Sequence, residues 1–180
     1  MLRGLTFGAA VLLFAALLPA ATLEQLGLDE MAERSTAIVR AHVASSYTAA
    51  SGPMIYTHYR VSVSERWKGP DAAELDVVVP GGAVGRQRQS FSGVPRLSSG
   101  REYVLFLWTG RSGLTHIIGL SQGIFDVVRG ADGALEVTRA ASGELMLDAA
   151  GRPVREQALT LHLSDLRVRV NRAIGKGATR

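Results

Sequence analysis

The longest alternation of apolar and polar positions in the chain covers residues 54–69. One side of a two-residue period carries the apolar set Ile55, Tyr59, Val61, Val63 and Trp67, interrupted by Thr57 and Glu65. The other side carries Tyr56, His58, Arg60, Ser62, Ser64 and Arg66. A strand separates two such sets, whereas a helix scatters them around its circumference. The pattern therefore predicts a long, curved antiparallel strand with one face in a core, ended by the turn signal at residues 67–70.

Shorter patterns on either side predict the partners of this strand. Residues 36–47 alternate so that Val39, Ala41 and Val43 face inward, and residues 75–79 form another strand pattern. Between the first strand and the long one, residues 45–53 are small and polar, which indicates a flexible hairpin loop. Three consecutive strands joined by short connections favour an antiparallel meander.

The second half of the chain continues the β pattern. Residues 101–109 are apolar on both faces, which predicts a strand covered by a barrel interior on one side and by a helix on the other. Residues 114–120 and 123–128 predict two more strands with a bend or bulge between them. Residues 130–153 alternate turn signals with short apolar pieces, so we expect a small meander at the edge of the main sheet.

Two segments have helical periodicity. In residues 22–35, Leu23, Leu26 and Met31 share a stripe, and Thr22 followed by Gln25 has the spacing of a capping box. Gly27 weakens this segment, which predicts either one short amphipathic helix or two turns. In residues 163–174 the apolar positions recur every four residues, with Ser164 as the expected N-cap and Gly175 as the expected end.

These elements predict a mainly β protein. The expected fold is an OB-like antiparallel barrel of five to six strands, with an N-terminal helix and a C-terminal amphipathic helix. We expect four segments: a leader at 1–21, the barrel core with its helix at 22–129, an edge hairpin or meander at 130–156, and the C-terminal helix with a basic tail at 157–180.

Residues 1–21 have the three-part form of a secretory signal peptide: Arg3, an apolar run over 5–18, and small residues after Pro19. The run is shorter than the roughly 20 apolar residues of a spanning helix, which favours cleavage over a retained anchor. The sequence thus predicts a secreted or periplasmic protein with no membrane association after cleavage. It has no cysteine, which excludes disulfides, thiolate metal sites and a cysteine nucleophile.

Charge changes this picture little. The chain has 20 Lys and Arg against 16 Asp and Glu, and removal of the leader with Arg3 lowers the formal net charge from +4 to +3. The cations are dispersed except near the end of the chain, so the sequence predicts no nucleic-acid partner.

One candidate binding surface lies in residues 80–100, a glycine-rich segment that carries Arg86, Arg88 and Arg96. Loops placed by a rigid sheet are a frequent location of binding sites. The polar face of the long strand, with Tyr56, His58 and Arg60, is the second part of this candidate. The alternative is a solvated connection whose arginines only keep the protein soluble, and loop position by itself favours that alternative.

Catalytic and metal-binding signals are weak. The histidines His42, His58, His116 and His162 form no metal-type pair, although His42 and His58 are expected on the outward faces of neighbouring strands. There is no G-x-S-x-G motif, no phosphate-binding loop and no paired-carboxylate pattern. We interpret Trp67 and Trp108 as buried packing residues. The sequence predicts no catalytic residue, no metal site and no cofactor.

Two motifs follow one another along the chain, V-x-E-x-W-K-G at 63–69 and G-x-x-Y-x-L-F-L at 100–107. Their order resembles that in a family of uncharacterised secreted bacterial proteins. More distantly, residues 23–128 are similar to the OB-type barrel of netrin-like modules and tissue inhibitors of metalloproteinases. Those inhibitors use an N-terminal cysteine to reach the protease zinc, and this chain has none, so no functional residue is implied.

The favoured function is an exported, non-enzymatic binding or interaction protein. Its partner, a protein or a polysaccharide, would contact Arg86, Arg88 and Arg96 together with Tyr56, His58 and Arg60. The resemblance implies an alternative, an inhibitor or accessory factor of a secreted metalloprotease. A hydrolase is the least favoured, because nothing in the sequence indicates a Ser-His-Asp arrangement. Its members can lie far apart in the chain, so the sequence does not exclude one either.

Overall fold

The computed structural model describes residues 22–141, 143–155 and 157–177. The predicted signal peptide at 1–21 lies outside these residues. Half of the described chain is in β-strands and 17% is helical, so the protein is mainly β as expected, and a C-terminal helix is present. None of the helices in this described part is long and apolar enough to cross a membrane.

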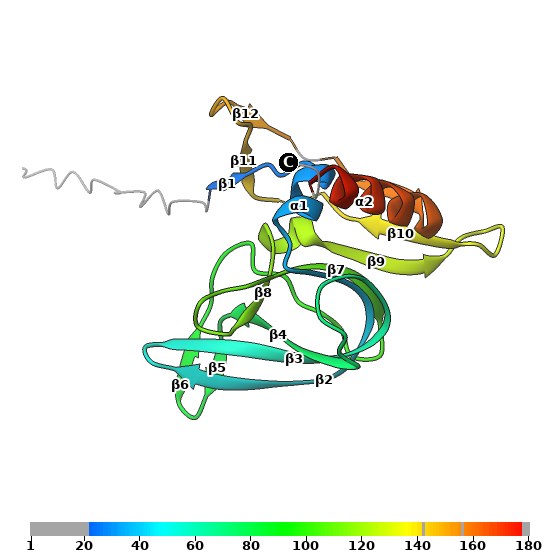
Figure 1. The fold of residues 1–180 in the computed structure, drawn as a ribbon. Coiled ribbons are helices and arrows are strands. Elements are labelled where there is room, and N and C mark those ends of the chain that lie inside the picture. The colour runs from blue at the N-terminus through cyan, green and yellow to red at the C-terminus, as the bar shows by residue number, and fades with distance from the viewer. Residues whose placement is uncertain (1–21, 142, 156, 178–180) are drawn as a thin grey trace, which may run out of the picture.

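The architecture is built on one eight-stranded sheet, which has two helices on one of its faces (Figure 1). The strand order is β13-β10-β9-β7-β2-β3-β4-β8. Their bounds are β2 Ala37–Ser51, β3 Met54–Lys68, β4 Glu74–Pro80, β7 Glu102–Thr109, β8 Thr115–Ile117, β9 Ile124–Arg129, β10 Leu135–Arg139 and β13 Leu159–His162. The helices are α1 Leu28–Arg34 and α2 Leu163–Gly177, and a 3-10 turn, η1 Leu120–Gly123, precedes β9.

The expected barrel of five to six strands is not what the structure contains. The short β8 pairs with β4 on one side and with β7 on the other, which curls the sheet. Beyond β7, however, β9, β10 and β13 extend the same sheet, so it is not a closed barrel. The difference has two causes. Strand β10, expected in a meander at the edge, pairs with β9 and so belongs to the main sheet, and β13, which no sequence pattern predicted, pairs with β10.

The long strand is present as β3 and pairs with β2 on one side and β4 on the other, which confirms the predicted meander. Tyr59, Val61 and Val63 lie in one core cluster, but Trp67 packs against the other. The cause is a bulge: Arg40 pairs with Glu65 and Ala41 with Val63, so Ser64 is extra. An inserted residue exchanges the two faces of a strand, and the assignment of Trp67 to the face of Val63 was therefore wrong.

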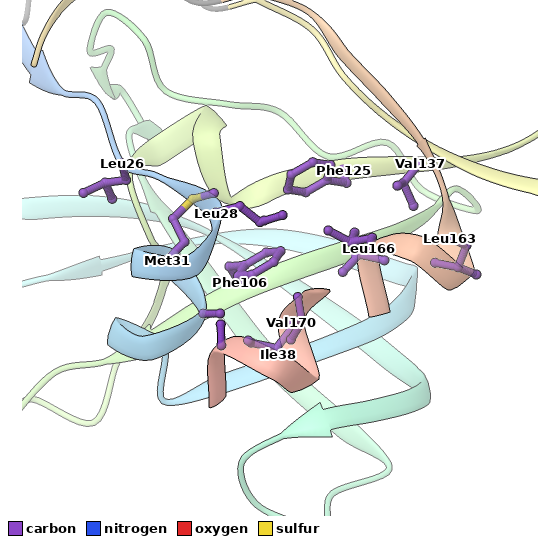
Figure 2. Packing of buried hydrophobic residues seen from close by; sticks show 13 residues of the cluster. Leu26, Leu28, Met31, Ile38, Phe106, Phe125, Val137, Leu163, Leu166 and Val170 are labelled. Atoms are coloured by element: carbon purple, nitrogen blue, oxygen red, sulfur yellow. The ribbon is translucent and has the colours of Figure 1, made fainter. Parts of the chain in front are cut away.

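Two apolar clusters lie on the two faces of β7. Tyr103, Leu105 and Leu107 belong to the cluster enclosed by the curled sheet. Val104 and Phe106 belong to the cluster beneath α1 and α2, which Figure 2 shows with Met31, Phe125 and Leu166 around Phe106. The prediction that this strand is buried on both faces, with helices over one of them, is confirmed, but the other face lies in a curled sheet and not in the interior of a closed barrel.

The N-terminal segment differs from the prediction. Thr22 does not cap a helix, because residues Thr22–Glu24 form strand β1, and the helix begins only after Gly27. Strand β1 pairs in parallel with β11 Leu145–Leu147, which in turn pairs with β12 Pro153–Val154. These three strands form a separate small sheet, so residues 145–154 are not an edge of the main sheet. Leu23 follows the strand pairing with Met146 because backbone hydrogen bonds outweigh a short helical stripe.

The C-terminal helix is confirmed, with different ends. It begins at Leu163, so Ser164 lies inside its first turn, and it continues through Gly175 to Gly177. Leu166, Val170 and Ala173 are buried under it. Its predicted end was wrong because a glycine in a helix costs only about 1 kcal/mol relative to alanine, less than the packing of the turns before it contributes.

The expected flexible loop at 45–53 is also absent. Strands β2 and β3 continue to Ser51 and Met54, and only Gly52 and Pro53 make the turn. Gly52 has φ +58°, the left-handed conformation that such a tight turn needs. The small polar residues of this segment form a long hairpin because their backbones pair in register with β3.

Candidate functional site

A cleft of about 300 Å³ lies between the β3–β4 part of the sheet and the segment that follows β4. Its walls come from two strands, from a hairpin of β5 Gly82–Val84 with β6 Gln87–Gln89, and from residues 90–96. The lining residues are Thr57, Tyr59, Val79, Pro80, Gly81, Gly82, Ala83, Arg88, Gln89, Ser90, Phe91, Val94, Pro95 and Arg96. The segment 80–100, expected as a loop, thus becomes one wall of a concave site.

Glycines let this wall approach the sheet closely. Gly81 and Gly82 follow β4 with φ of +100° and +137°, conformations that other residues rarely adopt. A Cβ on Gly82 would lie 2.8 Å from Cγ2 of Thr48. The chain therefore reverses after β4 and lays β5 directly across the β2–β3 hairpin, where the Thr48 hydroxyl donates to the carbonyl oxygen of Ala83 at 2.6 Å.

Polar side chains hold the wall in place. The Thr57 hydroxyl donates to the carbonyl oxygen of Gly81 at 2.9 Å. Gln89 binds the start of β3 and the turn that precedes it: its Oε1 accepts from the N–H of Ile55 at 2.7 Å, and its Nε2 donates to the carbonyl oxygen of Pro53 at 2.8 Å. Both the oxygen and the nitrogen of the Gln89 side-chain amide are occupied by these bonds. Gln89 therefore holds β6 in position beside the β2–β3 hairpin.

The two arginines that line the cleft form no ion pair within the described part of the chain. Seven arginines form ion pairs with carboxylates within the described residues. They are Arg34, Arg40, Arg66, Arg101, Arg152, Arg167 and Arg169. Arg88 and Arg96 line the cleft, and neither makes a hydrogen bond or an ion pair with any residue in the described ranges. Two uncompensated positive charges in a concave site create a positive potential that attracts anions.

The floor of the cleft is apolar. Tyr59 and Val79 are almost completely buried in the sheet, while Phe91 at the rim is 44% exposed. Together with Val94, these side chains give an apolar surface beside the two guanidinium groups. The arrangement suits an anionic group attached to an apolar or sugar-like body, and the volume is at the lower end of ligand sites, which fits one unit of a larger ligand.

The six residues predicted to form one surface lie in three places. Arg88 and Arg96 line the cleft, and Arg86 lies outside it between β5 and β6. Tyr56, His58 and Arg60 alternate with Thr57 and Tyr59 along β3, so they lie on the opposite face from the cleft. The structure therefore does not bring the two groups of candidate residues together.

The opposite face of β3 has its own polar and aromatic cluster. His58 Nδ1 lies 2.8 Å from Asp76 Oδ2, and the His58 ring stacks on Tyr47 with centroids 4.5 Å apart. The guanidinium of Arg60 lies 5.9 Å from the centroid of the Tyr47 ring. His42 is not part of this cluster, because it pairs with Ser62 whereas His58 pairs with Tyr47.

Sequence reasoning missed Tyr47, Asp76 and Trp108 on this face. Trp108 was expected to be buried but is 46% exposed, with its ring 5.9 Å from that of His116. It continues the face of Val104 and Phe106 beyond the cluster that the helices cover. Burial lowers the pKa of the adjacent His116. The helices cover Val104 and Phe106 but do not reach Trp108, and no local sequence signal shows where that cover ends.

Other chemistry receives no support from the described residues. Within them, no group of three or more His, Asp or Glu side chains is placed to hold a metal ion. Among the hydrogen bonds of the same residues, none joins a serine to a histidine, the pair that a hydrolase of the expected kind needs.

Together, the geometry defines a mainly β protein with a concave, cationic site beside the main sheet. Comparison of the chain with models of known protein families and with curated proteins finds no match.

Proposed function

We propose that this protein is an exported, non-enzymatic binding protein whose partner places an anionic group in the cleft. The observation that carries the proposal is the pair of arginines, Arg88 and Arg96, which line a concave site without a carboxylate partner among the described residues. Export rests on the three-part pattern of residues 1–21. The OB-type relationship belongs to the same proposal, and the meander β2–β3–β4 followed by β7 and β8 supports it.

The partner is a macromolecule with repeated or terminal acidic groups. The cleft is too small to enclose a large ligand, and an anionic unit of a polymer fits its volume and charge. Charge-assisted hydrogen bonds from two arginines fix the orientation of a carboxylate or sulfate. The apolar floor with Tyr59 and the rim residue Phe91 then contacts the body of that unit.

The test uses isothermal titration of the chain without residues 1–21 against three anionic polymers: polygalacturonate, heparin and poly-glutamate. We expect at least one to bind, and the double variant Arg88→Ala, Arg96→Ala to weaken that binding about a hundredfold, because each of the two lost charge-assisted bonds contributes roughly 1.5 kcal/mol.

Arg86→Ala is the matched control for each single cleft variant, Arg88→Ala and Arg96→Ala, since each of the three removes one positive charge from the same segment and only Arg86 lies outside the cleft. We expect it to change the affinity by about twofold at most, through the general potential alone. Equal losses from Arg86→Ala and from either cleft variant would show nonspecific attraction and contradict the proposal, as would the absence of binding to all three polymers.

A further inference from the structure

One edge of β2 is uncovered along half of its length. Strand β7 pairs with β2 only from Ala37 to His42. At Val43 the edge is still covered, since its N–H donates to the carbonyl oxygen of Arg101 at 3.0 Å and its own carbonyl accepts from the N–H of Gly100 at 2.8 Å. From Ser45 to Ser51, β2 pairs with β3 alone among the residues that the structure describes.

The backbone groups of three residues point out of this edge. The carbonyl oxygen of Ile55 accepts from the N–H of Gly81 at 2.7 Å, so the polar groups of Ile55 point toward β4. Its partner Ala50 must then point away from β3, because the two residues of a non-hydrogen-bonded antiparallel pair face opposite edges. By alternation, the N–H and C=O groups of Ser46 and Thr48 also point outward.

This edge lacks the usual protection against an added strand. Natural proteins protect free edges with lysines, prolines, inward charges or very short strands. Residues 45–51 contain no charged residue and no proline, and Tyr47 and Thr48 have high strand propensity. The segment is solvent-exposed over almost its entire length. The outward N–H and C=O groups of Ser46, Thr48 and Ala50, which alternate along the strand, are therefore available to pair with an added strand.

The charge beside the edge indicates what kind of strand fits. Arg60 lies on β3 opposite Ser45, and its guanidinium lies over the ring of Tyr47, which is on the edge strand and 43% exposed. Arg60 forms no ion pair with any described carboxylate. Asp76 lies opposite Arg60 on β4, but its carboxylate is bound by His58 at 2.8 Å and by the Tyr47 hydroxyl at 3.4 Å. An added strand with an acidic side chain on this face would give Arg60 the ion pair that it does not form with Asp76. A second copy of the chain presents Arg60 instead, which makes self-pairing the poorer match.

We propose that residues 45–51 of β2 bind an extended polypeptide segment that carries at least one acidic side chain. The segment adds as a ninth strand to the main sheet and exchanges backbone hydrogen bonds with Ser46, Thr48 and Ala50. Its acidic residue lies on the face of Tyr47 and Arg60. The edge is separate from the cleft, so this inference does not depend on the proposed function.

The test begins with selection of short random peptides, displayed on phage, against the chain without residues 1–21. We expect the selected peptides to be acidic and β-prone. With a selected synthetic peptide, amide hydrogen exchange should slow at Ser46, Thr48 and Ala50. The intervening amides of Tyr47 and Ala49, which already donate toward β3, should change little.

Proline substitution separates backbone recognition from side-chain recognition. Ser46→Pro and Ala50→Pro remove an outward N–H without removing a hydrogen bond to β3, and we expect each to weaken peptide binding about tenfold or more. Ser46→Ala and Ala50→Ser keep the N–H and should bind as the unchanged chain does. Arg60→Ala should weaken binding of acidic peptides while leaving the exchange pattern in place.

Several results would overturn the inference. These are failure to select any peptide, a selected peptide that leaves exchange at Ser46, Thr48 and Ala50 unchanged, and full binding by both proline variants. Slow exchange at the same amides without peptide, rising with protein concentration, would show that a second copy takes the edge. A far-UV circular dichroism spectrum equal to that of the unchanged chain confirms that a variant is folded, and the exchange pattern tests the inference independently of all variants.

Discussion

Two groups of arginines in this protein, one on β2 and one in the segment after β4, differ in their surroundings. Arg40, on the helix-covered side of β2, binds Glu65 at 2.7 Å and Glu102 at 2.8 Å. Arg88 and Arg96 line the cleft without any carboxylate among the described residues. The first arrangement uses its charges within the fold, whereas the second leaves them for a partner.

The comparison extends to the carboxylates. Glu65 accepts from Arg40, from Arg167 of α2 at 3.2 Å and from the indole N–H of Trp67 at 3.2 Å. This network connects the sheet to the C-terminal helix at the bulge in β3.

Glu144 lies beside the cleft wall, where it accepts from the Ser92 hydroxyl at 3.0 Å, but among the described residues no carboxylate forms an ion pair with Arg88 or Arg96. The comparison shows that this fold pairs an arginine with carboxylates where the charge serves the structure. The lack of such a pair at Arg88 and Arg96 therefore points to a role in binding.

The largest expected effect comes from breaking the paired site. Arg40→Leu leaves Glu65 and Glu102 half-buried with their main partner removed, and we expect it to lower the free energy of unfolding by about 3 kcal/mol. Urea denaturation measures this value. Arg88→Ala and Arg96→Ala should change it by less than about 0.5 kcal/mol each. A large loss of stability in either cleft variant would mean that the cleft arginines also serve the fold.

The second effect comes from the close approach that builds the cleft. Gly82→Val places a branched side chain at φ +137° and against Thr48, and we expect a loss of about 2 kcal/mol, measured by urea denaturation. Polymer binding should fall together with stability, because β5 can no longer lie against the hairpin. Gly85→Asn is the control: its φ is +57°, nothing lies near a Cβ there, and asparagine tolerates this conformation. Equal stability of both variants would contradict this account.

The third effect depends on pH. Burial raises the pKa of Glu65, but the hydrogen bond from Trp67 and the interaction with Arg40 outweigh it, so its pKa lies below the ordinary value of 4.5. A carboxyl with a lowered folded pKa stabilises the fold above pH 4.5, and this stabilisation is lost as the pH falls through the folded pKa. Urea midpoints between pH 7 and pH 3 should therefore fall less steeply in Glu65→Gln than in the unchanged chain. Parallel curves would show that the network does not depend on this charge.

The smallest effect concerns the two tryptophans. Trp108→Ala should cost about 0.5 kcal/mol, because the ring is half exposed at the end of β7. In the unchanged chain, iodide should quench mainly the fluorescence of Trp108, and Trp108→Phe should leave the slowly quenched emission of Trp67. Equal quenching of both would show that α2 does not cover Trp67.

Much of the fold followed from local patterns. The alternation in residues 54–69 predicted β3, and the doubly apolar run at 101–109 predicted a strand between two cores. The first succeeded because burial alternates with the two-residue period of a strand, and the second because a short run that is apolar on both faces is typical of a strand buried on both sides. The predictions for Trp67, Thr22 and Trp108 failed at points where a bulge, a distant strand and the reach of a helix decided the outcome.

The candidate site was predictable only in part. The glycines and arginines of residues 80–100 indicated the segment, and Arg88 and Arg96 indeed line a cleft. The sequence could not separate them from Arg86, nor place Tyr56, His58 and Arg60 on the other face of the sheet. A cleft depends on two glycine conformations and on contacts between Gly82 and Thr48, residues that are far apart in the chain.

By itself the sequence determined that this chain is mainly β, which segments pair as a meander, and that the strand at 101–109 is buried on both faces, because these depend on local patterns and turns. Tertiary structure alone decided which arginines are paired and which edge of β2 is left open. Both are set by where other elements end: β7 stops pairing at His42, and α2 reaches Glu65 but not the cleft.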